Sequence, residues 1–201
     1  MDGDDPVPAT GDYTLAFAVR AVLGRSAHPA KARVVVNLST SLVVEDAARA
    51  HEATLVRTPV GEAHVAAGIL AEKALIGGEG NGGVILPELH VGRDAPVGVA
   101  LVLQYLTAMG RPVSALVTEA PQYHIVKAKT ARGADLEAAY HRLTDQLSGA
   151  VVDRRDGLRL AWADRWVHVR PSGTEPVVRI IAEAPTEAEA QGLITRCRKL
   201  L

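Results

Sequence analysis

The sequence lacks the features that mark secreted, membrane-spanning and nucleic-acid-binding proteins. Cys197 is the only cysteine in 201 residues, so no disulfide can form within the chain, and a reducing compartment is indicated. Lys and Arg total 22 against 23 Asp and Glu, a balance that gives no support for binding to nucleic acid or to a membrane surface. No apolar run approaches the roughly 20 residues of a membrane helix. The N-terminus, MDGDDPVPATGDY, is acidic where a signal peptide is basic. We therefore expect a cytoplasmic protein.

Hydrophobic residues make up 48% of the chain, enough for a real core, and their spacing predicts an α/β domain in the first part. A predicted helix over residues 12–24 is followed by a turn-rich stretch. Predicted strands and helices then alternate, which is typical of a parallel sheet with helices on its faces. The predicted strands lie in 33–39, 53–61 and 74–88, the last of which contains two strands joined by a glycine loop. The predicted helices lie in 40–52, 62–73 and 93–110.

The order of elements changes in the last third of the chain. A strand over 122–130 and a helix over 134–149 precede two strands within 151–170, a strand over 176–184 and a final helix from Thr186. Thr186 and Glu189 have the spacing of a capping box. This β-α-β-β-β-α order predicts an antiparallel sheet with helices on one face.

These patterns predict three segments. Residues 1–28 contain the first predicted helix, 29–117 form an α/β domain, and 118–201 form an α+β domain, with a linker over 111–120. Since the helix in the first segment is strongly apolar, we expect it to be partly disordered or to self-associate.

A short loop near the C-terminus, RPSGTEPVVRI from Arg170, has the composition of a phosphate site. Ser172 and Thr174 can donate hydroxyl hydrogens, Gly173 lets backbone amides point inward, and Arg170 and Arg179 supply charge and forked donors. On spacing alone, a surface hairpin whose arginines pair with Glu175 or water is an equal alternative.

A second loop, GGEGNGG over residues 77–83, suits a sugar. Glu79 and Asn81 can bond to vicinal hydroxyls, while the glycines, Gly80 among them, let a ring approach the backbone. The loop follows a predicted strand of the α/β domain, and ligands bind at the carboxyl ends of such strands. The alternative is a flexible turn whose polar side chains face water.

Together these segments resemble the α-D-phosphohexomutase superfamily, which includes phosphoglucomutase, phosphomannomutase and phosphoglucosamine mutase. RPSGTEP followed by an arginine is similar to the family's phosphate-binding loop, and GEGNG to its sugar-recognition loop. RTPVG over 57–61 and HVGRD over 90–94 resemble segments at the rim of the active-site cleft. The resemblance implies that residues 1–28 are a hairpin and helix left from a preceding domain. It also implies that 29–117 have the three-layer α/β fold of the family's third domain and that 118–201 have the TATA-binding-protein-like fold of its fourth. The residues that it assigns are Arg170, Ser172, Gly173, Thr174 and Arg179 for phosphate, Glu79, Gly80 and Asn81 for sugar, and Thr58, Val60, Gly61, His90 and Arg93 for the rim.

The resemblance covers only the later half of a typical family member. Such members carry a phosphoserine loop and a magnesium loop in their first two domains. SAHP over 26–29 is interpreted as a turn, and DGDDP over 2–6 lacks the last Asp and the Arg of a metal loop. We therefore expect no catalytic and no metal-binding residue in this chain, with Mg²⁺ expected in the full-length enzyme.

Two functions remain open. In the first, the chain is the C-terminal part of a phosphohexomutase, inactive alone, that recognises a hexose phosphate and works with an N-terminal mutase half. In the second, it is a stand-alone, non-catalytic sugar-phosphate binding module.

Overall fold

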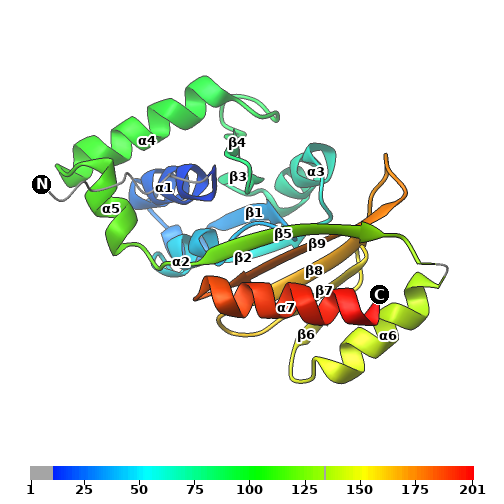
Figure 1. Cartoon of the computed structure of the whole chain (residues 1–201). Helices are drawn as coiled ribbons and strands as arrows, with labels where there is room; N and C mark the ends of the chain where they lie inside the picture. Colours follow the sequence, from blue (N-terminus) through cyan, green and yellow to red (C-terminus); the bar gives the residue numbers. More distant parts are fainter. Residues whose placement is uncertain (1–10, 134) are drawn as a thin grey trace, which may run out of the picture. The chain divides into compact units, whose positions relative to one another are not determined.

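A computed structural model describes residues 11–133 and 135–201, which form two compact units divided between Gln122 and Tyr123 (Figure 1). The acidic DGDDP segment lies outside the described residues. Unit 1 contains the following elements in chain order: α1 (Gly11–Gly24), the short helix η1 (Pro29–Lys31), β1 (Arg33–Asn37), α2 (Leu42–Arg49), β2 (Thr54–Thr58), α3 (Glu62–Glu72), β3 (Ile76–Glu79), β4 (Gly83–Ile85), α4 (Ala95–Met109) and α5 (Val113–Glu119).

The sheet of unit 1 has the strand order β2-β1-β3-β4, in which the first three strands are parallel and β4 runs antiparallel to β3. Helices cover both faces, as the two glycines of β3 demonstrate. A Cβ on Gly77 would meet Ile69 of α3, and a Cβ on Gly78 would meet Leu15 of α1. Because successive Cβ atoms point to opposite faces of a strand, α3 and α1 lie on opposite sides of the sheet. The expected three-layer α/β fold is therefore present.

Helix α1 belongs to unit 1, which differs from the expectation that it is left from another domain. Leu15, Phe17 and Val19 are at most 3% exposed, and the helix packs against α2, α4 and β3. Phe17 also stacks on Tyr105 of α4, with 5.3 Å between ring centroids. The apolar surface that predicted disorder or self-association is covered by the chain's own helices.

The predicted linker over 111–120 contains helix α5, with Leu116 and Val117 buried. The domain boundary consequently falls after Gln122 rather than after residue 117. In the described part of the chain no single helix is long and apolar enough to cross a membrane; α4 and α5 pass that test only as a pair, bent by 84°.

Unit 2 contains β5 (His124–Ala131), α6 (Leu136–Gln146), β6 (Val151–Asp153), β7 (Leu158–Ala161), β8 (Trp166–Pro171), β9 (Val177–Ala184) and α7 (Glu187–Leu200). The strands form an antiparallel sheet in the order β5-β9-β8-β7-β6. This sheet has one strand more than expected, because a turn with Gly157 at φ +75° divides the first predicted strand of 151–170 into β6 and β7. The α+β class is as expected.

One face of this sheet packs on α6 and α7. Val169, Val178 and Ile180 form a core with Leu143 of α6 and Ile194 of α7. The predicted cap at the start of α7 is present, with the Glu189 backbone N–H donating to the Thr186 hydroxyl at 3.3 Å. Residues that alternate with the core residues along β8 and β9 therefore point to the other face of the sheet.

Candidate functional site

In unit 1, polar side chains meet where the three parallel strands end. Asn37 is the last residue of β1, Thr58 of β2 and Glu79 of β3, and all three side chains are buried. Parallel strands have their carboxyl ends at one edge of the sheet, which is where ligands bind in this class of fold. The predicted sugar residue Glu79 and the predicted rim residue Thr58 are thus brought together.

Glu79 is held in one orientation by groups from different elements. Its Oε1 accepts hydrogen bonds from the Asn37 side-chain nitrogen at 2.8 Å and from the Gly61 backbone N–H at 3.2 Å. Arg93 Nη1 lies 3.7 Å from its Oε2. A carboxylate has about four acceptor positions, so Oε2 keeps capacity for a ligand hydroxyl.

Arg93 is fixed in turn by Glu62, at the start of α3. The Arg93 backbone N–H and Nε donate to the two Glu62 carboxylate oxygens at 3.0 and 2.8 Å. These hydrogen bonds, the backbone one first, lower the pKa of Glu62. Two predicted rim residues, Gly61 and Arg93, therefore lie beside Glu79. His90 is exposed, and its Nε2 lies 3.7 Å from an Asp94 carboxylate oxygen.

The rest of the glycine loop is a tight turn. A Cβ on Gly80 would lie 2.5 Å from the Asp12 carboxylate, so any other residue there would displace that side chain. Asn81 is exposed, and its Oδ1 accepts the Gly83 N–H at 3.1 Å. Its side chain stabilises the turn, and its role in sugar binding stays a prediction, as does the backbone contact assigned to Val60.

Sequence reasoning missed Asn37 and Asp12. Asp12 is 6% exposed and accepts the Ser41 backbone N–H at 3.0 Å, which joins α1 to the start of α2. Asn37 ends a β-branched run, RVVVN. A polar residue directly after buried valines, at a strand's carboxyl end, is the signal that could have identified it.

In unit 2, three cationic residues lie in one row across three neighbouring strands. Lys129 of β5 is opposite Arg179 of β9, which is opposite Arg170 of β8. Residues directly opposite in antiparallel strands share a face, here the face away from α6 and α7. Like charges in such positions repel, so an anion bound beside the row would relieve this repulsion.

The phosphate loop begins where Arg170 ends the row. Ser172 is 9% exposed. Its hydroxyl oxygen lies 3.4 Å from the Thr174 hydroxyl oxygen and 3.4 Å from the Thr174 backbone nitrogen, which donates to it. Gly173 is exposed, and a Cβ there would meet no atom within 4 Å. The two hydroxyls and the backbone of the turn therefore lie next to the three cations.

Two carboxylates partly neutralise the row. Glu175 lies 2.8 Å from Lys129 Nζ and 3.6 Å from Arg179 Nη2, and Asp156 lies 3.8 Å from Arg170 Nη1. The hydrogen bond from Lys129 and its charge lower the pKa of Glu175. Among the described residues, the buried Nε atoms of Arg170 and Arg179 have no hydrogen-bond partner.

A depression of about 490 Å³ adjoins the row and is lined by Lys127, Ala128, Lys129, Arg179 and Ile181. The five predicted phosphate residues thus lie in or beside one cationic surface. Lys129 lies beside them because the register of β5 and β9 places it opposite Arg179.

The described residues do not fit a metal. In residues 11–133 and 135–201, no three His, Cys, Asp or Glu side chains form a group that could hold an ion. A divalent cation with oxygen ligands needs several such groups at one place.

Two family models match nearly the whole chain. Residues 10–123 match the α/β/α domain III of phosphoglucomutase/phosphomannomutase, and residues 125–200 match its C-terminal domain. The chain belongs to the phosphoglucomutase/phosphomannomutase family and is homologous to the C-terminal part of phosphohexomutases.

Individual relatives support the same family assignment. The chain is 39% identical over 185 residues to a probable phosphoglucosamine mutase of Methanopyrus kandleri, covering 90% of this chain and 40% of the relative. It is 35% identical to a phosphoglucomutase/phosphomannomutase of Thermococcus kodakarensis, and the match covers 95% of this chain and 42% of that relative. The crystal structure of a phosphoglucomutase/phosphomannomutase family protein from Burkholderia thailandensis has the same fold, with a TM-score of 0.77 and 23% identity. The match covers 96% of this chain and 41% of that protein. The chain thus spans about two fifths of the length of the curated relatives it matches.

Proposed function

We propose that the chain recognises a hexose phosphate for a phosphohexomutase, which interconverts hexose 1- and 6-phosphates. In this proposal unit 2 binds the phosphate group and unit 1 binds sugar hydroxyls. The observation that carries the proposal is the row formed by Lys129, Arg179 and Arg170 beside the Ser172 and Thr174 hydroxyls.

The chemistry of the row suits a phosphate dianion. Guanidinium groups offer paired N–H donors that match two phosphate oxygens, and hydrogen bonds between charged groups are stronger than neutral ones. Hydroxyl and backbone donors complete the coordination of the remaining oxygens. The phosphate would replace Glu175 as the counter-ion of Lys129 and Arg179.

Glu79 gives the site its preference for a sugar. A carboxylate with a fixed orientation accepts hydrogen bonds from two neighbouring hydroxyls, and Arg93 Nη1 lies 3.7 Å from that carboxylate. The names of relatives, probable phosphoglucosamine mutase and phosphoglucomutase/phosphomannomutase, favour glucosamine, glucose or mannose phosphates as ligands.

The chemical step requires groups from outside these residues. We propose that an N-terminal mutase half supplies the phosphoserine and the Mg²⁺ site, so that the described residues bind and orient the ligand without catalysing the reaction. In this role the protein acts in the cytoplasm, without nucleic-acid or membrane partners. A stand-alone sugar-phosphate binding module is the second candidate, since the site-forming contacts of each unit lie within that unit.

Calorimetric titration of the whole chain with glucosamine 6-phosphate, glucose 1-phosphate and inorganic phosphate tests the assignment of each loop. Arg170→Gln removes a charged donor from the row and should weaken all three ligands by about tenfold or more. Glu79→Gln should weaken the two sugar phosphates and leave inorganic phosphate unchanged. Lys199→Gln, which removes a charge from the exposed side of α7, is the control.

The proposal is wrong if the wild-type chain binds none of these ligands at millimolar concentration, or if Lys199→Gln weakens them as much as Arg170→Gln. Interconversion of the two sugar phosphates, measured by phosphorus NMR, separates the two candidate functions. Activity that appears when the N-terminal half of a relative is added supports the mutase; sugar-phosphate binding without any gain of activity supports the binding module.

A further inference from the structure

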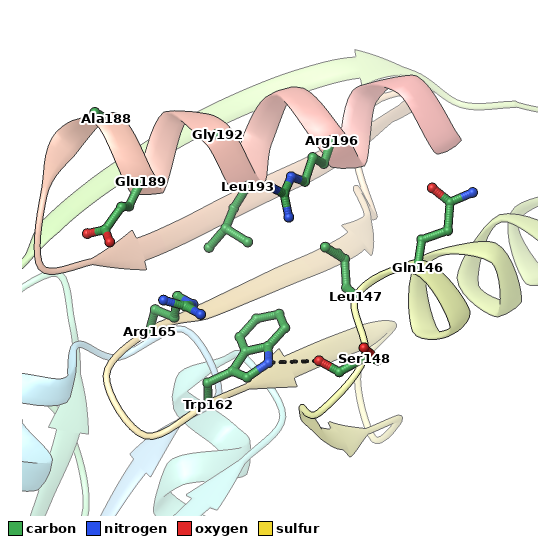
Figure 2. A pocket seen from close by; sticks show the side chains of 10 residues that line it. All are labelled: Gln146, Leu147, Ser148, Trp162, Arg165, Ala188, Glu189, Gly192, Leu193 and Arg196. Atoms are coloured by element: carbon green, nitrogen blue, oxygen red, sulfur yellow. Dashed lines mark hydrogen bonds between the residues drawn. The ribbon is translucent and has the colours of Figure 1, made fainter.

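Unit 2 has a cavity on the side of the sheet opposite to the cation row. It has a volume of about 560 Å³, within the range of small-molecule sites. The end of α6, the turn between β7 and β8, and one side of α7 surround it (Figure 2). Its lining residues are Gln146, Leu147, Ser148, Trp162, Arg165, Ala188, Glu189, Gly192, Leu193 and Arg196.

Two cations reach into this space. Figure 2 shows the guanidinium groups of Arg165 and Arg196 pointing toward the gap between α7 and Trp162. Arg165 Nη1 lies 3.8 Å from a carboxylate oxygen of its exposed neighbour Asp164. The carboxylate of Glu189 accepts a hydrogen bond from the Thr186 hydroxyl at 2.8 Å, so it is engaged at the start of α7.

A flat apolar surface lies beside the cations. The indole N–H of Trp162 donates to the Ser148 carbonyl at 3.2 Å, which fixes the ring. The guanidinium carbon of Arg165 lies 5.6 Å from the ring centroid, within the distance of a cation–π contact. Leu147 and Leu193 line the same space. The cavity therefore combines an indole ring and two leucine side chains with two guanidinium groups and one carboxylate, that of Glu189.

Gly192 is the third feature of the cavity. The packing of the chain does not require a glycine at this position. It lies in the middle of α7, where glycine is less favourable than alanine. A Cβ at this position would meet no atom within 4 Å. Because the space over Gly192 is open, a larger side chain at this position would extend into the cavity.

We propose that this cavity is a second ligand site, for a small anion that carries a planar ring, as a mononucleotide does. The phosphate pairs with Arg165 and Arg196, and the ring packs against Trp162 and the leucines. The site is separate from the hexose-phosphate site and does not depend on its assignment.

Titration of the whole chain with UMP and AMP, followed by calorimetry and by the indole N–H resonances, tests the proposal. We expect saturable binding that shifts the Trp162 resonance, with uridine and inorganic phosphate each binding more weakly than UMP. Arg196→Gln should weaken binding at least fivefold, and Lys199→Gln on the same helix should not. Gly192→Leu fills the cavity and should abolish binding without lowering the thermal midpoint.

The proposal would be overturned if neither nucleotide binds at millimolar concentration, if Arg196→Gln and Lys199→Gln lose the same affinity for the nucleotide, or if Gly192→Leu leaves nucleotide binding unchanged. Arg170→Gln distinguishes the two sites. If that variant abolishes nucleotide binding while Arg196→Gln leaves it intact, the nucleotide phosphate is held by the phosphate loop and the cavity is not its site.

Discussion

The close packing of β3 gives a quantitative test of how the sugar loop is positioned. A Cβ on Gly78 would lie 2.1 Å from the Gly83 carbonyl oxygen of β4 and 2.9 Å from a Leu15 methyl of α1. Ordinary contact begins at 3.4 Å, so Gly78→Ala requires β3 and β4 to separate by about 3.4 − 2.1 = 1.3 Å. Adding carbon to a well-packed core costs typically about 1–3 kcal/mol. We expect the upper end, since the nearest atom belongs to the backbone.

Urea unfolding followed by circular dichroism measures this loss. With a slope of about 1–3 kcal/mol per molar urea, Gly78→Ala should lower the midpoint by about 1 M or more. Hydrogen exchange should increase in peptides that cover β3 and β4. Gly192→Ala is the matched control, because its Cβ meets no atom within 4 Å, and it should stabilise the protein by about 0.5–1 kcal/mol. A midpoint that stays unchanged in Gly78→Ala would refute the packing argument.

Three further predictions concern charge and protonation. Glu175→Gln removes the carboxylate that competes for Lys129 and Arg179, so inorganic phosphate should bind about two- to fivefold more tightly by calorimetry; weaker binding would contradict the competition. Burial raises the pKa of the Cys197 thiol to about 12, so a thiol reagent at pH 8 should react only after urea unfolding, and rapid reaction with the native chain would show that α7 opens. Burial lowers the pKa of His168, whose Nε2 donates to the Asp156 carbonyl at 2.6 Å. The unfolded state then binds a proton that the folded state does not, so the free energy of unfolding should decrease as pH falls below about 6.5. His168→Gln should reduce that pH dependence, and an unaltered slope would exclude this explanation.

The sequence predicted those parts of the fold that depend on local pattern. The alternation of strands and helices in unit 1 and the cap at Thr186 follow from periodicity and from hydrogen-bonding residue types. Helix α5 was missed because seven residues after a proline carry too little pattern to distinguish a short helix from a linker. The extra strand was missed because β6 has only three residues and is mostly exposed.

The candidate site divides in the same way. Glycine, hydroxyl and arginine residues that are close in sequence predicted the two loops. The contacts between Asn37 and Glu79, 42 positions apart, and the row from Lys129 to Arg170 depend on which strands are neighbours and in what register. Strand order and register are tertiary properties, so no local pattern contains them. The apolar surface of α1 was correctly recognised, but sequence could not identify α4 as the helix that covers it.

The lysines of β5 have a consequence for the behaviour of the protein in solution. β5 is an edge strand, and with eight residues it is as long as β9 and much longer than β6, the opposite edge. A long edge strand with free backbone groups can pair with the edge of another molecule, and charged side chains oppose such pairing. Lys127 and Lys129 therefore protect the protein against edge-to-edge aggregation. Apolar substitutions at these positions should promote self-association even where no ligand is present.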